Sequence, residues 1–198
     1  MATLRSTYPL VWVDCEMTGL DVQNDSILSI ACFITDYQLN VIEPNGWEAI
    51  IHHEKSRLDQ MDEWCTQHHG QSGLIAATIA SKTTAEEAAE GLFQYVKQHV
   101  PKARVALLAG NSVHADKAFL SKTPYEKVLQ HLHYRIFDVS SLKEAVRRWA
   151  PDTVLGLVPK KQNLHTARED ILESIEEARF YKGFFDGSTQ NSSSASNV

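Results

Sequence analysis

Two acidic residues, Asp14 and Glu16, lie two positions apart in an otherwise apolar stretch of this 198-residue chain, residues 8–16. The stretch is rich in β-branched and aromatic residues and predicts a strand, on which alternate side chains share one face at a spacing of about 6 to 7 Å. A buried carboxylate without a partner costs several kcal/mol, and a metal ion is the simplest partner for two of them. The alternative is a solvated acid pair at an exposed strand end, so further acids are needed to decide.

Three more residues of suitable chemistry lie near the predicted starts of helices: Asp116, His165 and Asp170. Asp116 follows a predicted buried strand, at the edge of a sheet where α/β proteins commonly hold ligands. Five residues at about 100° each put His165 and Asp170 on different faces of the last helix, so we expect Asp170 to point back at the sheet while His165 reaches across a cleft. Each also has a structural alternative, as a first-turn acid or as a capping or surface histidine.

Together these positions favour metal-assisted hydrolysis of a phosphodiester. Carboxylates could hold two Mg²⁺ or Mn²⁺ ions about 3.5 to 4 Å apart and activate water for in-line attack. The metal-binding set would be Asp14, Glu16, Asp116 and Asp170. His165 would be the general base, since an unperturbed histidine pKa of about 6.5 suits proton transfer near neutral pH. Purely structural roles at all five positions would require five coincidences.

The elements that must position these residues are predicted from hydrophobic periodicity. Strands are expected over residues 8–16, 27–35, 47–52, 104–109 and 134–138. Apolar residues recur at helical spacing over residues 61–68, 85–96, 116–120, 141–149 and 167–178. A meander followed by strand and helix alternation predicts an α/β fold, a mixed five-stranded sheet flanked by helices, in one domain over residues 1–186. The Ser/Asn-rich tail, residues 187–198, is expected to be disordered.

Composition limits the class of protein. The 19 basic and 25 acidic residues give a net charge of −6, which does not support a long basic groove for nucleic acid, although metal-binding acids also count as negative. Apolar runs fall short of the roughly 20 residues that span a membrane, and residues 1–9 contain no apolar segment typical of a secretory signal. Three widely spaced cysteines, Cys15, Cys32 and Cys65, favour reduced thiols. We therefore expect an intracellular protein, cytoplasmic or mitochondrial.

Five segments in order resemble the oligoribonuclease family of DEDDh 3′→5′ exonucleases. They are VDCEMTGLD at 13–21, WCTQHHG at 64–70, AGNSVHAD at 109–116, YRIFDVS at 134–140 and HxAxxDI at 165–171. The resemblance, over about residues 8–182, implies an RNase H-like (DnaQ-like) fold, a homodimer, and hydrolysis of very short RNAs, especially dinucleotides, to nucleoside 5′-monophosphates. By position, Asp14, Glu16, Asp116 and Asp170 match the metal-binding acids and His165 the general base.

The same resemblance implies a substrate-binding set: Leu20, Trp64, His69, Ser112, Tyr134, Arg135 and Ser140. Leu20 would wedge against the bases, Trp64 would stack near them, and Tyr134 would reach in from the partner subunit. The 5′ phosphate would be capped by His69, Ser112, Arg135 and Ser140, which would block longer chains. From periodicity alone, Trp64 could equally be a core residue, Leu20 turn packing and Tyr134 an ordinary strand residue.

Two positions depart from the family pattern, and two other functions compete. Thr166 stands where Arg or Lys is frequent in the family, and Glu169 where a second Asp is common; neither is a matched catalytic position. A related DEDDh enzyme could trim longer RNA or DNA strands, but the implied phosphate cap argues against this. A non-catalytic nucleotide-binding relative is the other alternative, and the five filled catalytic positions argue against it.

Overall fold

The computed structural model describes residues 7–159 and 166–186 of the chain, so His165 and the tail at 187–198 lie outside the described residues. Within them, one five-stranded sheet is formed by β1 (Leu10–Met17), β2 (Ile27–Thr35), β3 (Trp47–Ile50), β4 (Leu107–Gly110) and β5 (His133–Asp138). The strand order is β3-β2-β1-β4-β5. The β1 strand pairs antiparallel with β2 and parallel with β4, which confirms the predicted mixed sheet.

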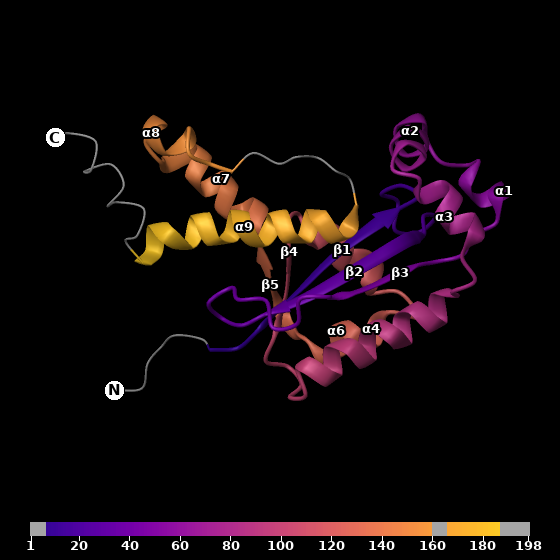
Figure 1. Cartoon of the computed structure of the whole chain (residues 1–198), viewed down its shortest axis with the longest axis horizontal. Helices are drawn as coiled ribbons and strands as arrows, with labels where there is room; N and C mark the ends of the chain where they lie inside the picture. The colour runs from indigo at the N-terminus through magenta and orange to yellow at the C-terminus, as the bar shows by residue number, and fades with distance from the viewer. Residues whose placement is uncertain (1–6, 160–165, 187–198) are drawn as a thin grey trace.

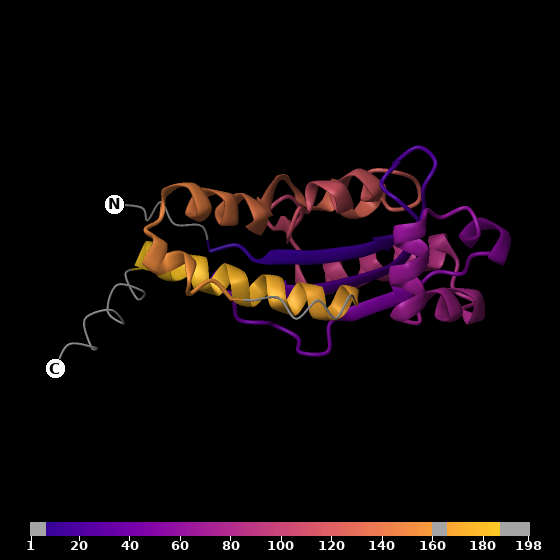
Figure 2. The same ribbon diagram turned by 90° about the horizontal axis from the view of Figure 1, so that it is seen from above.

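Helices cover both faces of this sheet. Their bounds are α1 (Lys55–Leu58), α2 (Glu63–Gln71), α3 (Leu74–Ala80), α4 (Ala85–His99), α5 (His114–Leu120), α6 (Glu126–His131), α7 (Val139–Trp149), α8 (Asp152–Leu155) and α9 (Ala167–Asp186). Figure 1 shows α9 over one face and α4 and α6 over the other. In Figures 1 and 2, α1, α2 and α3 gather at the end of the sheet toward which β1 runs.

The two faces of β1 are buried in different cores. Val11 and Val13 pack with α4 and α6 in one apolar cluster, whereas Trp12 packs with Ile171 and Ile175 of α9 in the other. Because side chains alternate along a strand, Asp14 and Glu16 continue the row of Trp12 on the α9 side. The start of α9 therefore meets the acidic end of β1.

Several element boundaries differ from the sequence-based expectation. The strand predicted over 104–109 begins only at Leu107, because Arg104 has a left-handed backbone, φ 63°, and its amide donates to the carbonyl of His131. Four short helices that periodicity did not indicate, α1, α3, α6 and α8, are present. The cysteines Cys15, Cys32 and Cys65 are buried free thiols, as predicted. No helix within the described ranges has the length and apolar character needed to cross a membrane.

Candidate active site

Three of the predicted metal ligands meet where β1 ends beneath α9. Carboxylate oxygens of Asp14, Glu16 and Asp170 all lie within 4.8 Å of one another. Asp14 and Glu16 come from one face of β1, and Asp170 from the first turn of α9, next to buried Ile171. Packing of Ile171 against the sheet fixes this turn over the strand, so residues 154 positions apart in sequence become neighbours. Three carboxylates at this spacing could hold a metal ion.

The fourth acid, Asp116, is buried beside the same strand. Its Oδ1 accepts a hydrogen bond of 2.9 Å from the amide of Cys15, the residue between Asp14 and Glu16. Asp116 is the third residue of α5, which follows β4, the parallel neighbour of β1. This agrees with the predicted placement at the carboxyl edge of the sheet, and it brings all four acids from three elements to one end of β1.

The electrostatics of the cluster fit a bound cation. Burial, followed by repulsion from Asp170 and Asp116, raises the pKa of Glu16 to about 7. Burial likewise raises the pKa of Asp116 to about 6. A positive charge nearby stabilises the ionised form of carboxylates that burial and mutual repulsion make hard to ionise. A donor set made only of oxygen atoms is the kind that Mg²⁺ and Mn²⁺ prefer.

A pocket of about 340 Å³ opens beside these acids. Glu16 lies at its edge, and its wall includes Ala31 of β2, Leu74 of α3 and Thr166 at the start of α9. Thr166 Oγ1 accepts from the amide of Glu169 at 3.4 Å, so this departure from the family pattern supplies a side chain that suits a helix start. The volume lies within the range of small-ligand sites, which makes the pocket a candidate for part of a substrate.

Three residues of the predicted substrate-binding set are exposed: Leu20 and Trp64, predicted to contact bases, and Tyr134, predicted to reach in from a partner subunit. Leu20 is 77% exposed, Trp64 59% and Tyr134 71%, so the core alternative for Trp64 and the packing alternative for Leu20 are wrong, whereas Tyr134 is an exposed residue of β5. The Trp64 ring stacks on His68 of the same helix, with centroids 3.9 Å apart. On β5, the Arg135 guanidinium lies over the Tyr134 ring. Large rings held open to solvent are suited to stacking on bases.

Two residues of the predicted phosphate cap, Ser112 and Ser140, lie together. Ser112 and Ser140 bring their hydroxyls within 3.1 Å of each other, and the Ser112 amide donates to Asp138 Oδ1. Ser140 Oγ also donates to Asn111 Oδ1. Sequence reasoning missed Asn111 and Asp138 as organisers of this hydroxyl pair, although both lie inside the matched segments at 109–116 and 134–140.

His69 has a more buried place than a phosphate ligand at the surface would have. It is 4% exposed, and its Nε2 donates to the carbonyl of Met17 at 2.9 Å. Its Nδ1 lies 3.9 Å from Glu16 Oε2, and burial lowers the pKa of the imidazole. The contacts in this structure tie α2 to the end of β1, and contact with a phosphate stays a prediction.

Comparison with known proteins gives one family. A family model described as exonuclease, RNase_T, matches residues 11–178. The mitochondrial oligoribonuclease of Saccharomyces cerevisiae is 44% identical over 87% of this chain and 66% of its own length. The mitochondrial oligoribonuclease of Mus musculus is 47% identical over 87% of this chain and 71% of its own length. The oligoribonuclease of Hydrogenovibrio crunogenus is 44% identical over 90% of this chain and 95% of its own length. The chain thus spans just under two thirds of the yeast protein and most of the bacterial one.

Solved structures agree in fold. E. coli exonuclease I in complex with a dT13 oligonucleotide superposes with a TM-score of 0.67 at 16% identity, covering 90% of this chain and 41% of that chain. A zinc-bound form of exonuclease I with single-stranded DNA gives a TM-score of 0.65 at 16% identity, covering 89% and 41%. At this identity the likeness shows the fold alone, and it confirms the expected RNase H-like exonuclease architecture.

Proposed function

The chain belongs to the oligoribonuclease family of exonucleases, and from that premise we propose that it is a 3′→5′ exoribonuclease that degrades very short RNAs, especially dinucleotides, to nucleoside 5′-monophosphates. The observation that carries the proposal is the convergence of Asp14, Glu16 and Asp170 within 4.8 Å, with Asp116 bonded to the same strand. Four carboxylates from distant parts of the sequence are expensive to bury together unless they serve a cation.

The proposed cofactors are two divalent cations, Mg²⁺ or Mn²⁺, held by Asp14, Glu16, Asp116 and Asp170. When bound, such ions neutralise charge on the reacting phosphate and increase the acidity of water at the site. The protein's own contribution is to keep the four acids in place: the Cys15 amide holds Asp116, and the buried side of α9 holds Asp170.

His165 is the proposed general base, which takes a proton from the attacking water. It lies outside the described residues, one position before Thr166, which lines the pocket beside Glu16. A histidine has the ordinary pKa for this task near neutral pH. Its proposed role rests on its position in the matched HxAxxDI segment and on the nearness of that segment's Asp170 to the acids.

The proposed substrate contacts divide between bases and phosphate. Leu20 and Trp64 present exposed apolar surface to bases, which is sequence-tolerant because every base has a stacking face. The proposed cap for the 5′ phosphate comprises His69, Ser112, Arg135 and Ser140, with Arg135 and the hydroxyls as charged and neutral donors. A dinucleotide carries few phosphates, so a chain of net charge −6 needs no long basic groove.

A homodimer completes the proposed site, with Tyr134 reaching the neighbouring subunit. Tyr134 lies on β5, one of the two edge strands of the described sheet, and it is 71% exposed. An exposed edge strand with an exposed aromatic residue is suited to contact a second chain. We further propose that residues 1–186 act as one exonuclease domain inside the cell, in the cytoplasm or, as the names of the yeast and mouse relatives suggest, in mitochondria.

The test compares labelled RNAs of two and twenty nucleotides, incubated with the purified chain and Mn²⁺ or Mg²⁺. We expect rapid conversion of the dinucleotide to monophosphates, slow attack on the longer RNA and no reaction in EDTA. Asp170→Asn should abolish turnover, whereas Glu176→Gln, an exposed acid on the same helix that pairs with Arg179, should not change it. Faster degradation of the longer RNA would favour the alternative, an exonuclease of longer strands.

A further inference from the structure

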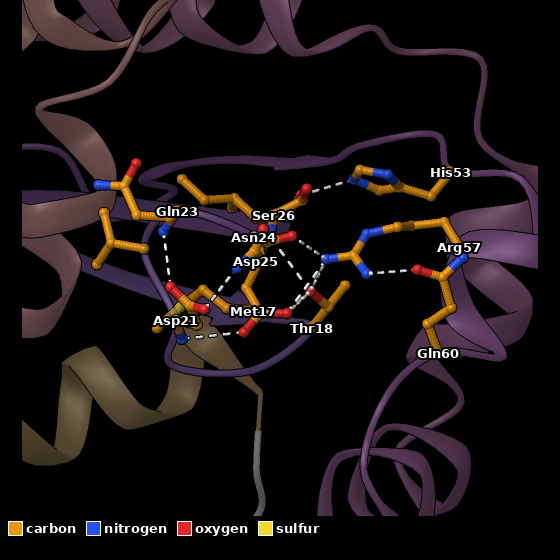
Figure 3. A network of polar contacts seen from close by, with 12 residues as sticks. Met17, Thr18, Asp21, Gln23, Asn24, Asp25, Ser26, His53, Arg57 and Gln60 are labelled. Carbon is orange, nitrogen blue, oxygen red and sulfur yellow. Dashed lines mark hydrogen bonds and ion pairs between the residues drawn. The ribbon is translucent and has the colours of Figure 1, made fainter.

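The loop between β1 and β2, residues 18–26, carries Leu20 and follows directly after Glu16 and Met17. Leu20 projects into solvent, so its own packing does not fix where it stands. Whatever sets the position of this loop therefore sets the distance between the proposed base wedge and the acids. The contacts that do so are drawn in Figure 3.

The carboxylate of Asp25 accepts hydrogen bonds from other residues of the same loop. Its Oδ1 accepts from Thr18 Oγ1 at 2.7 Å, and its Oδ2 accepts from the amide of Asp21 at 2.9 Å. These two residues flank Gly19 and Leu20. A Cβ on Gly19 would lie 2.4 Å from Asp25 Oδ2, so glycine is what allows the backbone to pass this close to the carboxylate.

Arg57, on helix α1, binds Asp25 and Thr18 from outside the loop. Its Nη2 donates to Thr18 Oγ1 at 2.8 Å, to the carbonyl of Asn24 at 2.7 Å and to Asp25 Oδ1 at 3.1 Å. The Arg57 and Asp25 side chains are only 24% and 19% exposed, so this ion pair is partly shielded from water and is stronger than an ordinary surface pair. We call the contacts among Arg57, Asp25 and Thr18 the clasp.

The clasp joins the two segments that present groups to bases. Leu20 is in the loop, and α1 leads within a few residues to α2, which begins at Glu63 and carries Trp64. We propose that Arg57 is a positioning residue for substrate, which through Asp25 and Thr18 fixes Leu20 relative to Trp64 and the acids. This inference rests on the proposed function, since it takes Leu20 and Trp64 to be the groups that contact bases.

The loop has enough bonds of its own to remain folded without Arg57. The Thr18 amide donates to the carbonyl of Ser26, the Asp25 amide to that of Asp21, and Lys122 Nζ bonds the carbonyl of Val22 from the far side. The contribution of Arg57 is thus the placement of the loop against α1, and its loss should affect substrate binding more than folding.

The experiment measures steady-state hydrolysis of a dinucleotide by Arg57→Met, which keeps the aliphatic stem and removes the guanidinium. We expect KM to rise about five- to twentyfold with kcat within about twofold, the pattern of a lost binding contribution. Arg57→Lys can reach Asp25 but not all three acceptors, so its KM should lie between those of wild type and Arg57→Met. The control is Lys55→Met on the same helix, whose ammonium bonds Asp59, the residue that follows α1, and it should leave both constants unchanged.

Coupling to Leu20 separates positioning from a general structural effect. In a Leu20→Ala background, Arg57→Met should change KM less than about twofold, because the group it positions is gone. An equal loss of affinity in both backgrounds overturns the proposal, as does an unchanged KM in Arg57→Met. Gly19→Ala, which pushes on the same carboxylate from inside the loop, should raise KM similarly and show the same dependence on Leu20.

A second readout keeps this inference distinct from the proposed function. Hydrogen exchange at the amides of Asp21 and Asp25 should be faster in Arg57→Met than in wild type or Lys55→Met. If wild type does not hydrolyse the dinucleotide, the proposed function fails and the assignment of Leu20 fails with it. If wild type is active but exchange at these amides is the same in all three proteins, the clasp does not fix the loop and the inference alone is overturned.

Discussion

Asp116 Oδ1 and the amide nitrogen of Cys15 are joined by a hydrogen bond of 2.9 Å that links α5, the helix after β4, to β1. The bond places a buried acid from the start of α5 against the strand segment that presents Asp14 on one side of Cys15 and Glu16 on the other. Its length and burial mean that the same carboxylate stabilises the local backbone and adds negative charge to the cluster. These two effects can be separated by mutation.

Asp116→Asn should keep the hydrogen bond and lose the charge, because an amide oxygen can also accept from Cys15. We expect kcat for a dinucleotide to fall roughly 100-fold or more, while the free energy of unfolding in metal-free buffer stays within about 1 kcal/mol of wild type. Asp116→Ala should lose the same activity and also about 1 to 3 kcal/mol of stability, since the buried amide is left without an acceptor. Urea unfolding and steady-state kinetics provide both measurements. Undiminished activity in Asp116→Asn would contradict a metal-binding role for this residue.

The raised pKa values of Glu16, about 7, and Asp116, about 6, predict a pH-dependent stability in the absence of metal. A carboxyl group whose pKa is raised on folding binds its proton more tightly in the folded state. Its contribution to stability is therefore fully present below the unfolded-state pKa of about 4 and is lost as the pH rises through the folded-state value. With EDTA present, wild type should lose stability between about pH 5 and pH 7.5 relative to Glu16→Gln.

Thermal unfolding of the two proteins at matched pH checks this, because the difference between them isolates the contribution of Glu16 from that of every other group. Mn²⁺ at pH 7.5 should raise the Tm of wild type, because the cation binds the folded state only, and should raise that of Glu16→Gln less. Parallel curves for the two proteins, with and without Mn²⁺, would mean that Glu16 neither resists ionisation nor contributes to metal binding.

Trp64 should contribute to substrate affinity and little to folding, because it is 59% exposed and its described ring contact is to His68 on the same helix. We expect Trp64→Ala to raise KM for a dinucleotide about 5- to 150-fold, in line with about 1 to 3 kcal/mol for one stacked base, and Trp64→Phe to retain much of the affinity. The Tm should move by less than about 2 °C. Tyr37→Ala, a half-exposed aromatic in the turn after β2, is the control and should change none of these values. If Trp64→Ala lowered the Tm and left KM unchanged, the result would indicate that Trp64 contributes to packing and not to substrate binding.

Sequence reasoning predicted the acidic cluster because each step used a fixed geometric period. Residues two apart on a strand share a face, which placed Asp14 beside Glu16. A helix with a buried stripe at Ala167, Ile171 and Ile175 had to turn Asp170 toward the same sheet. The convergence of Asp170 on the strand follows from these periods together with α/β layering. The mixed sheet was predictable for the same reason.

Contacts that do not follow from helix and strand periodicity or from the α/β layers could not be predicted from the sequence. Arg57 bonds a loop more than 30 residues away through a long flexible side chain, and nothing in its neighbourhood distinguishes it from a solvated surface arginine. His69 was assigned by resemblance, but its bond to the Met17 carbonyl depends on how α2 sits at the end of β1. The late start of β4 depends on a left-handed Arg104, a conformation that the residue type itself disfavours.

A residue that acts across a subunit boundary can be tested by mixing two inactive proteins. Tyr134→Ala should lack the aromatic contributed to the neighbour, and Asp116→Asn should lack an acid of its own site. In a mixed dimer, the subunit with intact acids receives an intact Tyr134 from its partner, so one of the two sites is complete. With free exchange at equal amounts, about half of the dimers are mixed, and activity should recover to about a quarter of wild type.

The recovery should grow, per Tyr134→Ala subunit, as Asp116→Asn is added in excess, because more of those subunits then have a partner with Tyr134. If Tyr134 instead serves the site of its own subunit, no mixture contains a complete site and the activities simply add. The control mixes Asp116→Asn with Asp14→Asn. Each variant lacks an acid of its own site, so no mixed dimer contains a complete site and activity should not recover at any ratio. Dimer mass from light scattering on the same samples is required, since a monomer with full dinucleotide activity would contradict a site shared between subunits.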